Sequence, residues 1–148
     1  MTETVSSISE LPNAYRPCVG ITLINPDGLI WIGARANVNG QAEGPGSWWQ
    51  MPQGGIDAGE NPREAAVREL FEETGVKSAT HIADMPDWLS YDLPSNLVPK
   101  SWGGRFRGQT QMWVAMRFTG DDSEVNITPA AGHQVEFVAW RWARRAEV

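Results

Sequence analysis

The first regular pattern of apolar positions in the chain is a pair of short runs separated by a turn. The segment PCVGITLI at 17–24 and the segment LIWIG at 29–33 enclose the tetrapeptide NPDG at 25–28. Pro and Gly stand in this tetrapeptide where a reversing turn favours them. The pattern therefore predicts two strands that form a hairpin near the start of the chain.

Further strands are expected along the rest of the chain. SWWQMP at 47–52 is typical of a short strand, and THIADMPDWLSYDLP at 80–94 is typical of a strand followed by a loop that prolines interrupt. EVNI at 124–127 is expected to add a short strand, and VEFVAWRW at 135–142 a final one. The clearest alternation runs through 108–120, where every second residue is apolar. These residues are Met112, Val114, Met116 and Phe118.

One strong helix is predicted over Pro62–Thr74. Asn61 is a suitable N-cap, Pro62 suits the first helical position, and Glu64 completes a capping box. Gly75 is the expected C-cap. An apolar stripe on one face of the helix is expected to pack on the strands. Its members are Ala66, Leu70 and, more loosely, Val67 and Phe71.

The order of these elements indicates a mixed α/β domain, since several strands flank few helices. Residues 1–14 are polar and aperiodic and are expected to form a flexible tail, which leaves 15–148 as one domain. With 148 residues, 41% of them hydrophobic and 20% charged, the chain can bury a core and is not of the disordered class.

Composition and charge exclude some classes of function. The net charge of −6 disfavours stable, sequence-blind binding to duplex nucleic acid. The longest apolar runs are too short to span a membrane, and the first residues lack the features of a signal peptide. Cys18 cannot form an internal disulfide, because it is the only cysteine, and is expected to be a buried thiol. We therefore expect a cytoplasmic protein.

The predicted helix carries an unusual group of acids. Glu69, Glu72 and Glu73 lie at positions i, i+3 and i+4, so their side chains share one face. Like charges at this spacing cost about 0.2–0.5 kcal/mol per pair, whereas Mg²⁺ or Mn²⁺ would reverse the sign of the interaction. A solvated acidic face is the alternative. The glycine-rich loop 54–59 runs directly into this helix and favours close approach of a ligand.

This segment resembles the nudix signature, G-x5-E-x7-R-E-U-x-E-E-x-G-U with U aliphatic. The matching positions are Gly54, Glu60, Arg68, Glu69, Leu70, Glu72, Glu73, Gly75 and Val76. The resemblance implies an α/β/α sandwich with a mixed sheet, and Mg²⁺- or Mn²⁺-dependent hydrolysis of nucleoside diphosphates linked to another group. It implies that Glu69, Glu72 and Glu73 hold metal, with Glu69 the first candidate for the base.

The same resemblance suggests roles for other residues of the signature. The Gly54 carbonyl is expected to add a metal ligand. Glu60 and Arg68 are expected to form a structural pair that ties the loop to the helix, with direct catalysis as the alternative.

Segments outside the signature resemble one branch of the family. YRPCVG, SWWQMPQGGID, DWLSYDLP, GQTQMW and EFVAWRW are similar to bacterial RNA pyrophosphohydrolases and diadenosine polyphosphate hydrolases. The branch implies removal of pyrophosphate from the 5′ end of triphosphorylated RNA. The alternative is a diadenosine tetraphosphate hydrolase that gives AMP and ATP. A non-catalytic nucleotide-binding module is a third reading, which the intact glutamates disfavour.

The branch also implies substrate and metal residues outside the helix. Those expected at the substrate are Arg16, Arg35, Gln53, Tyr91 and Gln109. The arginines suit phosphate oxygens, with surface salt bridges as the alternative. Tyr91 is expected near the base or phosphates, with packing as its alternative. Glu136 is expected to contribute to metal binding, although taken alone a glutamate in a strand usually faces solvent.

Two departures from the branch stand out. Thr110 and Met112 replace lysines, and the second of these lysines is expected to face the phosphates, so binding of a polyphosphate should weaken unless Arg105 or Arg107 compensates. Relatives also continue beyond the WRW strand into a further helix with an aromatic that stacks on the base, which this chain, ending in RWARRAEV, is expected to lack. A stacking partner contributes about 1–3 kcal/mol per base.

Overall fold

A computed structural model describes residues 14–36, 49–92, 105–128 and 136–148. Its elements in chain order are β1 (Tyr15–Ile24), β2 (Ile30–Arg35), β3 (Trp49–Gln50), β4 (Gln53–Gly55), α1 (Pro62–Thr74), β5 (Ala79–Asp84), β6 (Leu89–Asp92), β7 (Gly108–Phe118), the 3-10 turn η3 (Asp122–Glu124), β8 (Phe137–Ala143) and the 3-10 turn η4 (Arg145–Glu147). The predicted tail lies, apart from its last residue, outside the described residues. No helix among those described is both long and apolar enough to span a membrane.

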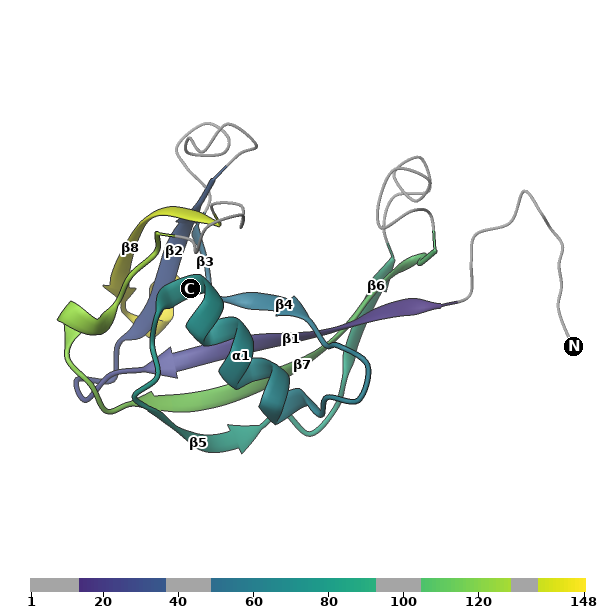
Figure 1. Ribbon diagram of the computed structural model, residues 1–148, viewed down its shortest axis with the longest axis horizontal. Helices are drawn as coiled ribbons and strands as arrows, with labels where there is room; N and C mark the ends of the chain where they lie inside the picture. Colours follow the sequence, from purple (N-terminus) through teal and green to yellow (C-terminus); the bar gives the residue numbers. More distant parts are fainter. Residues whose placement is uncertain (1–13, 37–48, 93–104, 129–135) are drawn as a thin grey trace, which may run out of the picture.

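The strands form one mixed sheet in the order β3-β2-β1-β7-β5 (Figure 1). The central pair, β1 and β7, is parallel along its whole length, and the other pairs are antiparallel. β1 pairs with β2 only at Ile24 and Ile30. Beyond this point the two strands diverge, and β4 pairs with β1 instead from Cys18 to Gly20. The divergence opens a gap between β2 and β4, and the site described below lies there.

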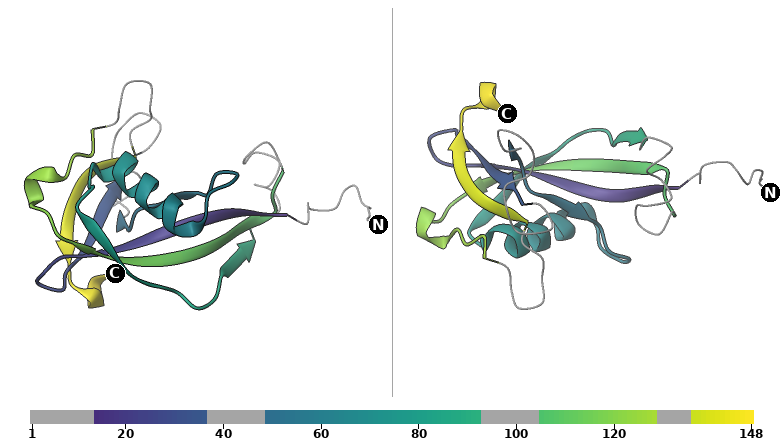
Figure 2. Two further views of the ribbon diagram at one scale, coloured as in Figure 1. Left: turned by 60° about the horizontal axis from the view of Figure 1, so that its bottom comes forward. Right: turned by 90° about the horizontal axis from the view of Figure 1, so that it is seen from above.

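Helix α1 lies across one face of the sheet, and the core fills the space between them (Figure 2). Paired residues of β1 and β7, such as Val19 with Met112 and Ile21 with Val114, point to the same face. They pack against Ala65, Ala66 and Leu70 of the helix in one buried cluster. Within the described ranges α1 is the single α-helix, so the second helical layer of an α/β/α sandwich has no counterpart there.

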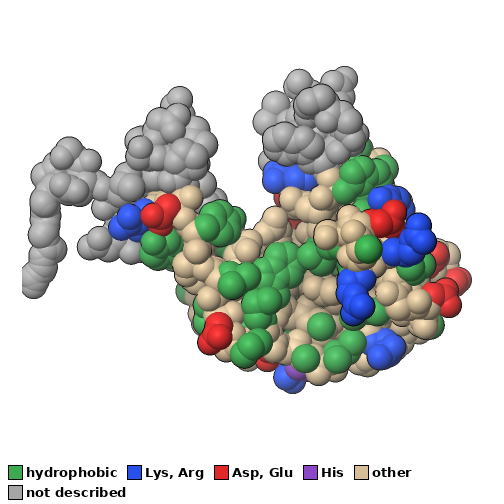
Figure 3. Space-filling view, turned by 180° about the vertical axis from the view of Figure 1, so that it is seen from behind, with side chains coloured by type: hydrophobic (Ala, Val, Ile, Leu, Met, Phe, Trp, Pro, Cys, Tyr) green, Lys and Arg blue, Asp and Glu red, His purple; other side chains and the backbone are tan. Residues whose placement is uncertain are grey.

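The opposite face of the sheet carries a band of hydrophobic side chains (Figure 3). Met51 and Trp113 line one hollow on this face, and Trp113 also lines a second hollow with Met85. The turn η4 lies on this side of the sheet (Figure 2, right), where Glu147 and Val148 line the first hollow.

The predicted helix has the bounds of α1, with the capping box of Asn61 and Glu64 and the left-handed cap at Gly75 both present. The predicted apolar stripe was wrong at two of its members. Val67 and Phe71 are 52% and 46% exposed, because the helix meets the sheet along a narrow stripe centred on Ala66 and Leu70.

Some strand predictions also need correction. EVNI forms no strand: η3 covers its first residue, and the Glu124 carboxylate accepts the backbone N–H groups of Lys77 and Ser78 at 2.6 and 2.9 Å. These contacts hold the segment against the end of α1 and away from a strand ladder. Two strands were not predicted, β4 within the glycine-rich loop and β6 within the proline-containing loop.

Candidate active site

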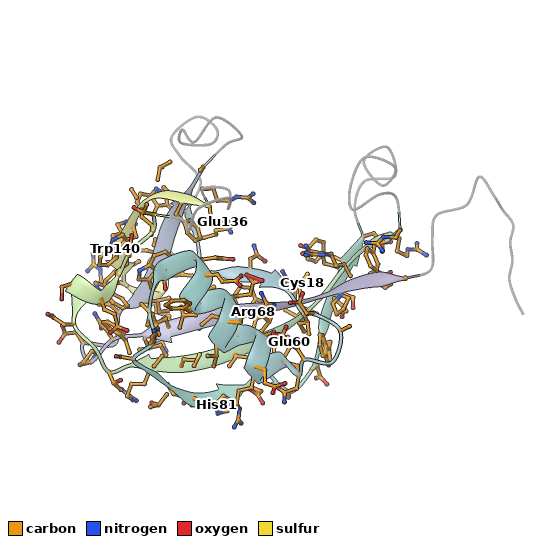
Figure 4. All side chains as sticks on the ribbon, in the orientation of Figure 1. Cys18, Glu60, Arg68, His81, Glu136 and Trp140 are labelled. Carbon is orange, nitrogen blue, oxygen red and sulfur yellow. The ribbon has the colours of Figure 1, made fainter. Side chains whose placement is uncertain are left out.

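The loop before α1 is tied to the helix by one arginine. Arg68 donates from Nε to Glu60 Oε2 at 2.7 Å and from Nη2 to the Gly55 carbonyl at 2.8 Å. Its Nη1 donates to Glu69 at 3.1 Å and to Glu72 at 3.2 Å. The hydrogen bond from Arg68 lowers the pKa of Glu60 to about 2. Glu60 and Arg68 therefore have the geometry expected of a pair that joins the loop to the helix (Figure 4).

This arrangement also explains how the helix tolerates its acids. The Arg68 guanidinium offsets the charges of Glu69 and Glu72, but it makes no described contact with Glu73. Glu73 is 7% exposed, and its burial beside Glu69 raises its pKa far above the ordinary range for a carboxyl group. Burial also raises the pKa of Glu69. The backbone N–H of Gln53 donates to Glu73, which is the main contact that favours its ionised form.

Glu69 and Glu73 face a polar cavity of about 430 Å³ in the gap between β2 and β4, which we call the catalytic pocket. The residues that line it are Arg16, Cys18, Arg35, Gln50, Gln53, Gly54, Gly55, Glu69, Glu73, Gln109 and Glu136. The two arginines come from β1 and β2, and Glu136 directly precedes β8, which pairs with β2 (Figure 4). Elements far apart in the sequence thus bring acidic and basic side chains to one cavity.

The structure brings most of the predicted site residues together, with two exceptions. Glu72 bonds to Arg68 on the exposed side of the helix and does not line the catalytic pocket. Tyr91 lines the neighbouring hollow of about 370 Å³, and its hydroxyl donates to Gln109 at the boundary between the two cavities. The roles of both residues in binding stay predictions.

Two adjacent glycines are required by close approach of charged groups. A Cβ atom on Gly54 would overlap the carboxyl group of Glu69, and one on Gly55 would overlap the guanidinium of Arg16. Neither glycine has a positive φ, so space and not backbone conformation selects them. Glycine at 54 and 55 therefore lets a metal-binding candidate and a phosphate-binding candidate approach the same short strand.

The acids of the pocket have the chemistry of a divalent-cation site. The carboxyl of Glu73 lies buried beside Glu69, and the negative charge of Glu136 acts on it as well. Mg²⁺ and Mn²⁺ prefer the oxygen ligands that these residues offer, and such a cation would offset their negative charge. In the described part of the chain, no three His, Cys, Asp or Glu side chains already converge on one point. The donor set fits a cation that would draw the acids together with phosphate oxygens.

Two residues of the catalytic pocket, Gln50 and Cys18, and one of the neighbouring hollow, Gln111, were missed or interpreted incompletely. Gln50 and Gln111 were not predicted, although the alternation in GQTQMW places Gln111 on the same face as Gln109 and could have revealed it. Cys18 is buried as predicted, at 1% exposure, and it also lines the catalytic pocket. Its sulfur accepts a hydrogen bond of 3.4 Å from Arg16.

The structure shows where the two residues that replace the expected lysines, Thr110 and Met112, lie. Met112 packs in the core on the α1 side of β7, so the expectation that position 112 faces the phosphates is wrong for this chain. Alternation along the strand directs Gln109 and Gln111 to the other face. Thr110 bonds to Ser90 at 2.8 Å on the surface. Arg107, one of the two residues proposed to compensate, pairs with Asp92 at 3.3 Å, and neither it nor Arg105 lines the pocket.

Comparison with known proteins agrees with this arrangement. The NUDIX domain model matches residues 14–148. The chain is 54% identical over 130 residues to an RNA pyrophosphohydrolase of Rhizobium meliloti, covering 86% of this chain and 78% of the relative. It is also 54% identical over 128 residues to an RNA pyrophosphohydrolase of Afipia carboxidovorans, covering 86% of this chain and 76% of the relative.

Solved structures show the same fold at low identity. The dihydroneopterin triphosphate pyrophosphohydrolase of E. coli superposes with a TM-score of 0.65 at 19% identity, covering 91% of this chain and 86% of that one. An Ap4A hydrolase of C. elegans superposes with a TM-score of 0.60 at 16% identity, covering 89% and 82%. The expected fold, a mixed sheet with the signature loop and helix, is confirmed. The chain belongs to the NUDIX family.

Proposed function

We propose that this chain is a divalent-cation-dependent pyrophosphohydrolase that removes pyrophosphate from the 5′ end of triphosphorylated RNA. The observation that carries the proposal is the catalytic pocket, where buried acids and two arginines meet in a chain more than half identical to RNA pyrophosphohydrolases. The arrangement suits a substrate that presents several phosphates at one end, because the arginines and the cation can share the negative charge.

The residues of the catalytic pocket would have different roles according to their charge. Glu69, Glu73 and Glu136, with the Gly54 carbonyl and with Glu72 as a further candidate, would hold Mg²⁺ or Mn²⁺. When bound, such a cation neutralises charge on the bridging phosphates and makes water a better nucleophile.

The basic and amide side chains would hold the phosphate chain. Arg16 and Arg35 donate charge-assisted hydrogen bonds to phosphate oxygens, which fixes the position of the chain against the acids. Gln53 and Gln109 add neutral hydrogen bonds. Glu69 is our first candidate to accept a proton from the attacking water, because its carboxyl group lies in the pocket and Arg68 holds it in place.

The experiment is a comparison of substrates in the presence of Mg²⁺. The protein is incubated separately with 5′-triphosphorylated RNA, diadenosine tetraphosphate and a panel of mononucleotides. The proposal predicts pyrophosphate and monophosphorylated RNA as the products of preferred turnover. Preferred release of AMP and ATP would assign the chain to dinucleoside polyphosphates, and binding of the substrates without turnover would indicate a non-catalytic module.

A matched pair of variants connects the activity with the pocket. Glu73→Gln changes a buried acid of the pocket, whereas Glu64→Gln changes an acid of the same helix that serves the N-cap. Turnover should be lost in the first variant and kept in the second. Equal activity in both would place the reaction outside this pocket.

A further inference from the structure

A chain of hydrogen bonds runs from the hydrophobic hollow on the far side of the sheet to the catalytic pocket. Trp113 donates from Nε1 to Gln111 Oε1 at 3.3 Å. Gln111 donates from Nε2 to Gln53 Oε1 at 2.8 Å and to Gln109 Oε1 at 3.4 Å. The hydroxyl of Tyr91 also donates to Gln109 Oε1. We call these five residues the amide relay.

The Trp113 end of the amide relay has a fixed polarity. An indole N–H can donate a hydrogen bond but cannot accept one. Gln111 must therefore turn its carbonyl oxygen toward Trp113, and its NH₂ group then points the other way, toward Gln53 and Gln109. Since Tyr91 also donates to Gln109, both neighbours of Gln111 receive hydrogen bonds on their carbonyl oxygens.

The position of Trp113 is itself held by the fold. Trp113 pairs with Gly20 of β1, and a Cβ atom on Gly20 would overlap the indole ring. The ring thus lies flat against the backbone of the central strand. Gln111 is 8% exposed, so its amide has little access to water. A donor or acceptor of this amide that lacks a partner would therefore lower the stability of the fold.

The consequence for the catalytic pocket concerns the side-chain amides of Gln53 and Gln109, which line it. A glutamine amide can turn either its acceptor or its donors toward a ligand. Within the relay Gln109 Oε1 accepts two hydrogen bonds and Gln53 Oε1 accepts one, so both oxygens are turned toward the relay and the NH₂ groups are turned toward a ligand. Gln53 Nε2 already donates one hydrogen bond to Gln50 Oε1, at 3.4 Å. Phosphate oxygens are acceptors only, so donors are what they require.

We propose that Trp113, through Gln111, and Tyr91, through its direct bond to Gln109, act as positioning residues that orient Gln53 and Gln109 so that both present NH₂ donors to a polyphosphate. The inference deepens the proposed function, on which it rests for the identity of the ligand. It also assigns a role to a half-buried tryptophan and a buried glutamine, which otherwise only fill space beside the pocket.

The test reverses the polarity of the relay at its centre. In Gln111→Glu the side chain keeps its shape, but it can no longer donate two hydrogen bonds. Gln53 and Gln109 would then turn their NH₂ groups toward it and their oxygens toward the phosphates. Gln111→Met removes the link without reversing it, and Trp113→Phe removes the donor at one end. Ser90→Ala, which loses a surface hydrogen bond on the strand of Tyr91, is the control.

Two measurements are made on each variant. One is the Kd for inorganic tripolyphosphate by calorimetry with Ca²⁺ as the cation, and the other is kcat and KM for triphosphorylated RNA with Mg²⁺. Gln111→Glu should raise Kd and KM about tenfold, the effect of one lost hydrogen bond to a charged group. Gln111→Met and Trp113→Phe should raise them less, kcat should fall less than KM rises, and Ser90→Ala should match the wild type.

The proposal is overturned if Gln111→Glu binds tripolyphosphate as the wild type does, or if Gln111→Glu and Gln111→Met weaken binding equally. The second result is what a packing role predicts. If Gln111→Glu fails to fold, Trp113→Phe decides, since an unchanged Kd in that variant also overturns the proposal. A wild type that binds tripolyphosphate but does not hydrolyse RNA would refute the proposed function, while the calorimetry would still test the relay.

Discussion

Replacement of Gly54 by alanine is expected to lower the activity of the protein while leaving its stability nearly unchanged. The added Cβ atom would overlap the carboxyl group of Glu69, whose three heavy atoms are the nearest to it. That group is the end of a flexible side chain, so it can move by about 1 Å, and a misplacement of this size can cost about 10² in rate. The carboxylate would leave the position in which Arg68 now holds it.

The effect on stability should be small for two reasons. Gly54 lies in an extended strand without a positive φ, so alanine fits its backbone. Loss of a glycine also lowers the entropy of the unfolded chain, which stabilises the fold by about 0.4–1 kcal/mol and offsets the cost of moving Glu69. We therefore expect Tm to stay within about 4 °C of the wild type.

The assay is pyrophosphate release from triphosphorylated RNA at saturating Mg²⁺, with thermal unfolding measured on the same samples. Gly54→Ala should lower kcat about a hundredfold. Gly55→Ala is the matched control, because its Cβ would displace the guanidinium of Arg16 and not the carboxyl of Glu69. It should raise KM more than it lowers kcat. A kcat for Gly54→Ala within about threefold of the wild type, at unchanged Tm, would refute the reasoning.

Three further predictions concern single side chains. Glu73→Gln should lower the rate by at least about 10², comparable to the loss of one strong electrostatic contact with the transition state; steady-state kinetics within a few-fold of the wild type would contradict it. Asn61→Ala removes the capping box of the helix and should lower the free energy of unfolding by about 1 kcal/mol in denaturant titrations, with activity kept in the folded protein. The backbone N–H groups of Lys77 and Ser78 hold the pKa of Glu124 below its ordinary value. This carboxylate therefore stabilises the fold at pH values above the pKa that Glu124 has in the unfolded chain. The stabilisation is lost as the pH falls through the lower pKa of Glu124 in the folded protein. Glu124→Gln should flatten the acid side of the stability profile, and an unchanged slope in denaturant titrations across that range would contradict the assignment.

The parts of the fold that were predicted from the sequence depend on neighbours in the chain. Helix α1 was predicted to its last residue because its caps, Asn61 with Glu64 and Gly75, are local signals. The core face of β7 was predicted because alternation requires only the strand itself. Val67 and Phe71 were wrongly predicted to pack on the sheet because they are apolar. The width of the contact between helix and sheet depends on the sheet and is not visible in the helix sequence.

The catalytic pocket was predictable from the sequence only through a resemblance. Arg16 and Arg35 come from separate strands and Glu136 directly precedes a third, and the pairing of β4 with β1 and of β8 with β2 brings them to the acids of the helix. Such pairings are set by the whole sheet and have no local signal. For Gln111 the alternation of its own strand could have shown the face on which it lies, but its part in the relay depends on the side chains around it.

The central claim is that the acids of the catalytic pocket tolerate their proximity because divalent cations, bound together with a phosphorylated nucleotide, neutralise them. Crystals grown with Mn²⁺ and a non-hydrolysable analogue of a 5′-triphosphorylated nucleotide test it most directly, because anomalous scattering locates the metal. We expect manganese bound to Glu69 and Glu73, with the phosphates between the metal and Arg16. Manganese and nucleotide bound elsewhere, with both carboxyl groups unliganded, would contradict it.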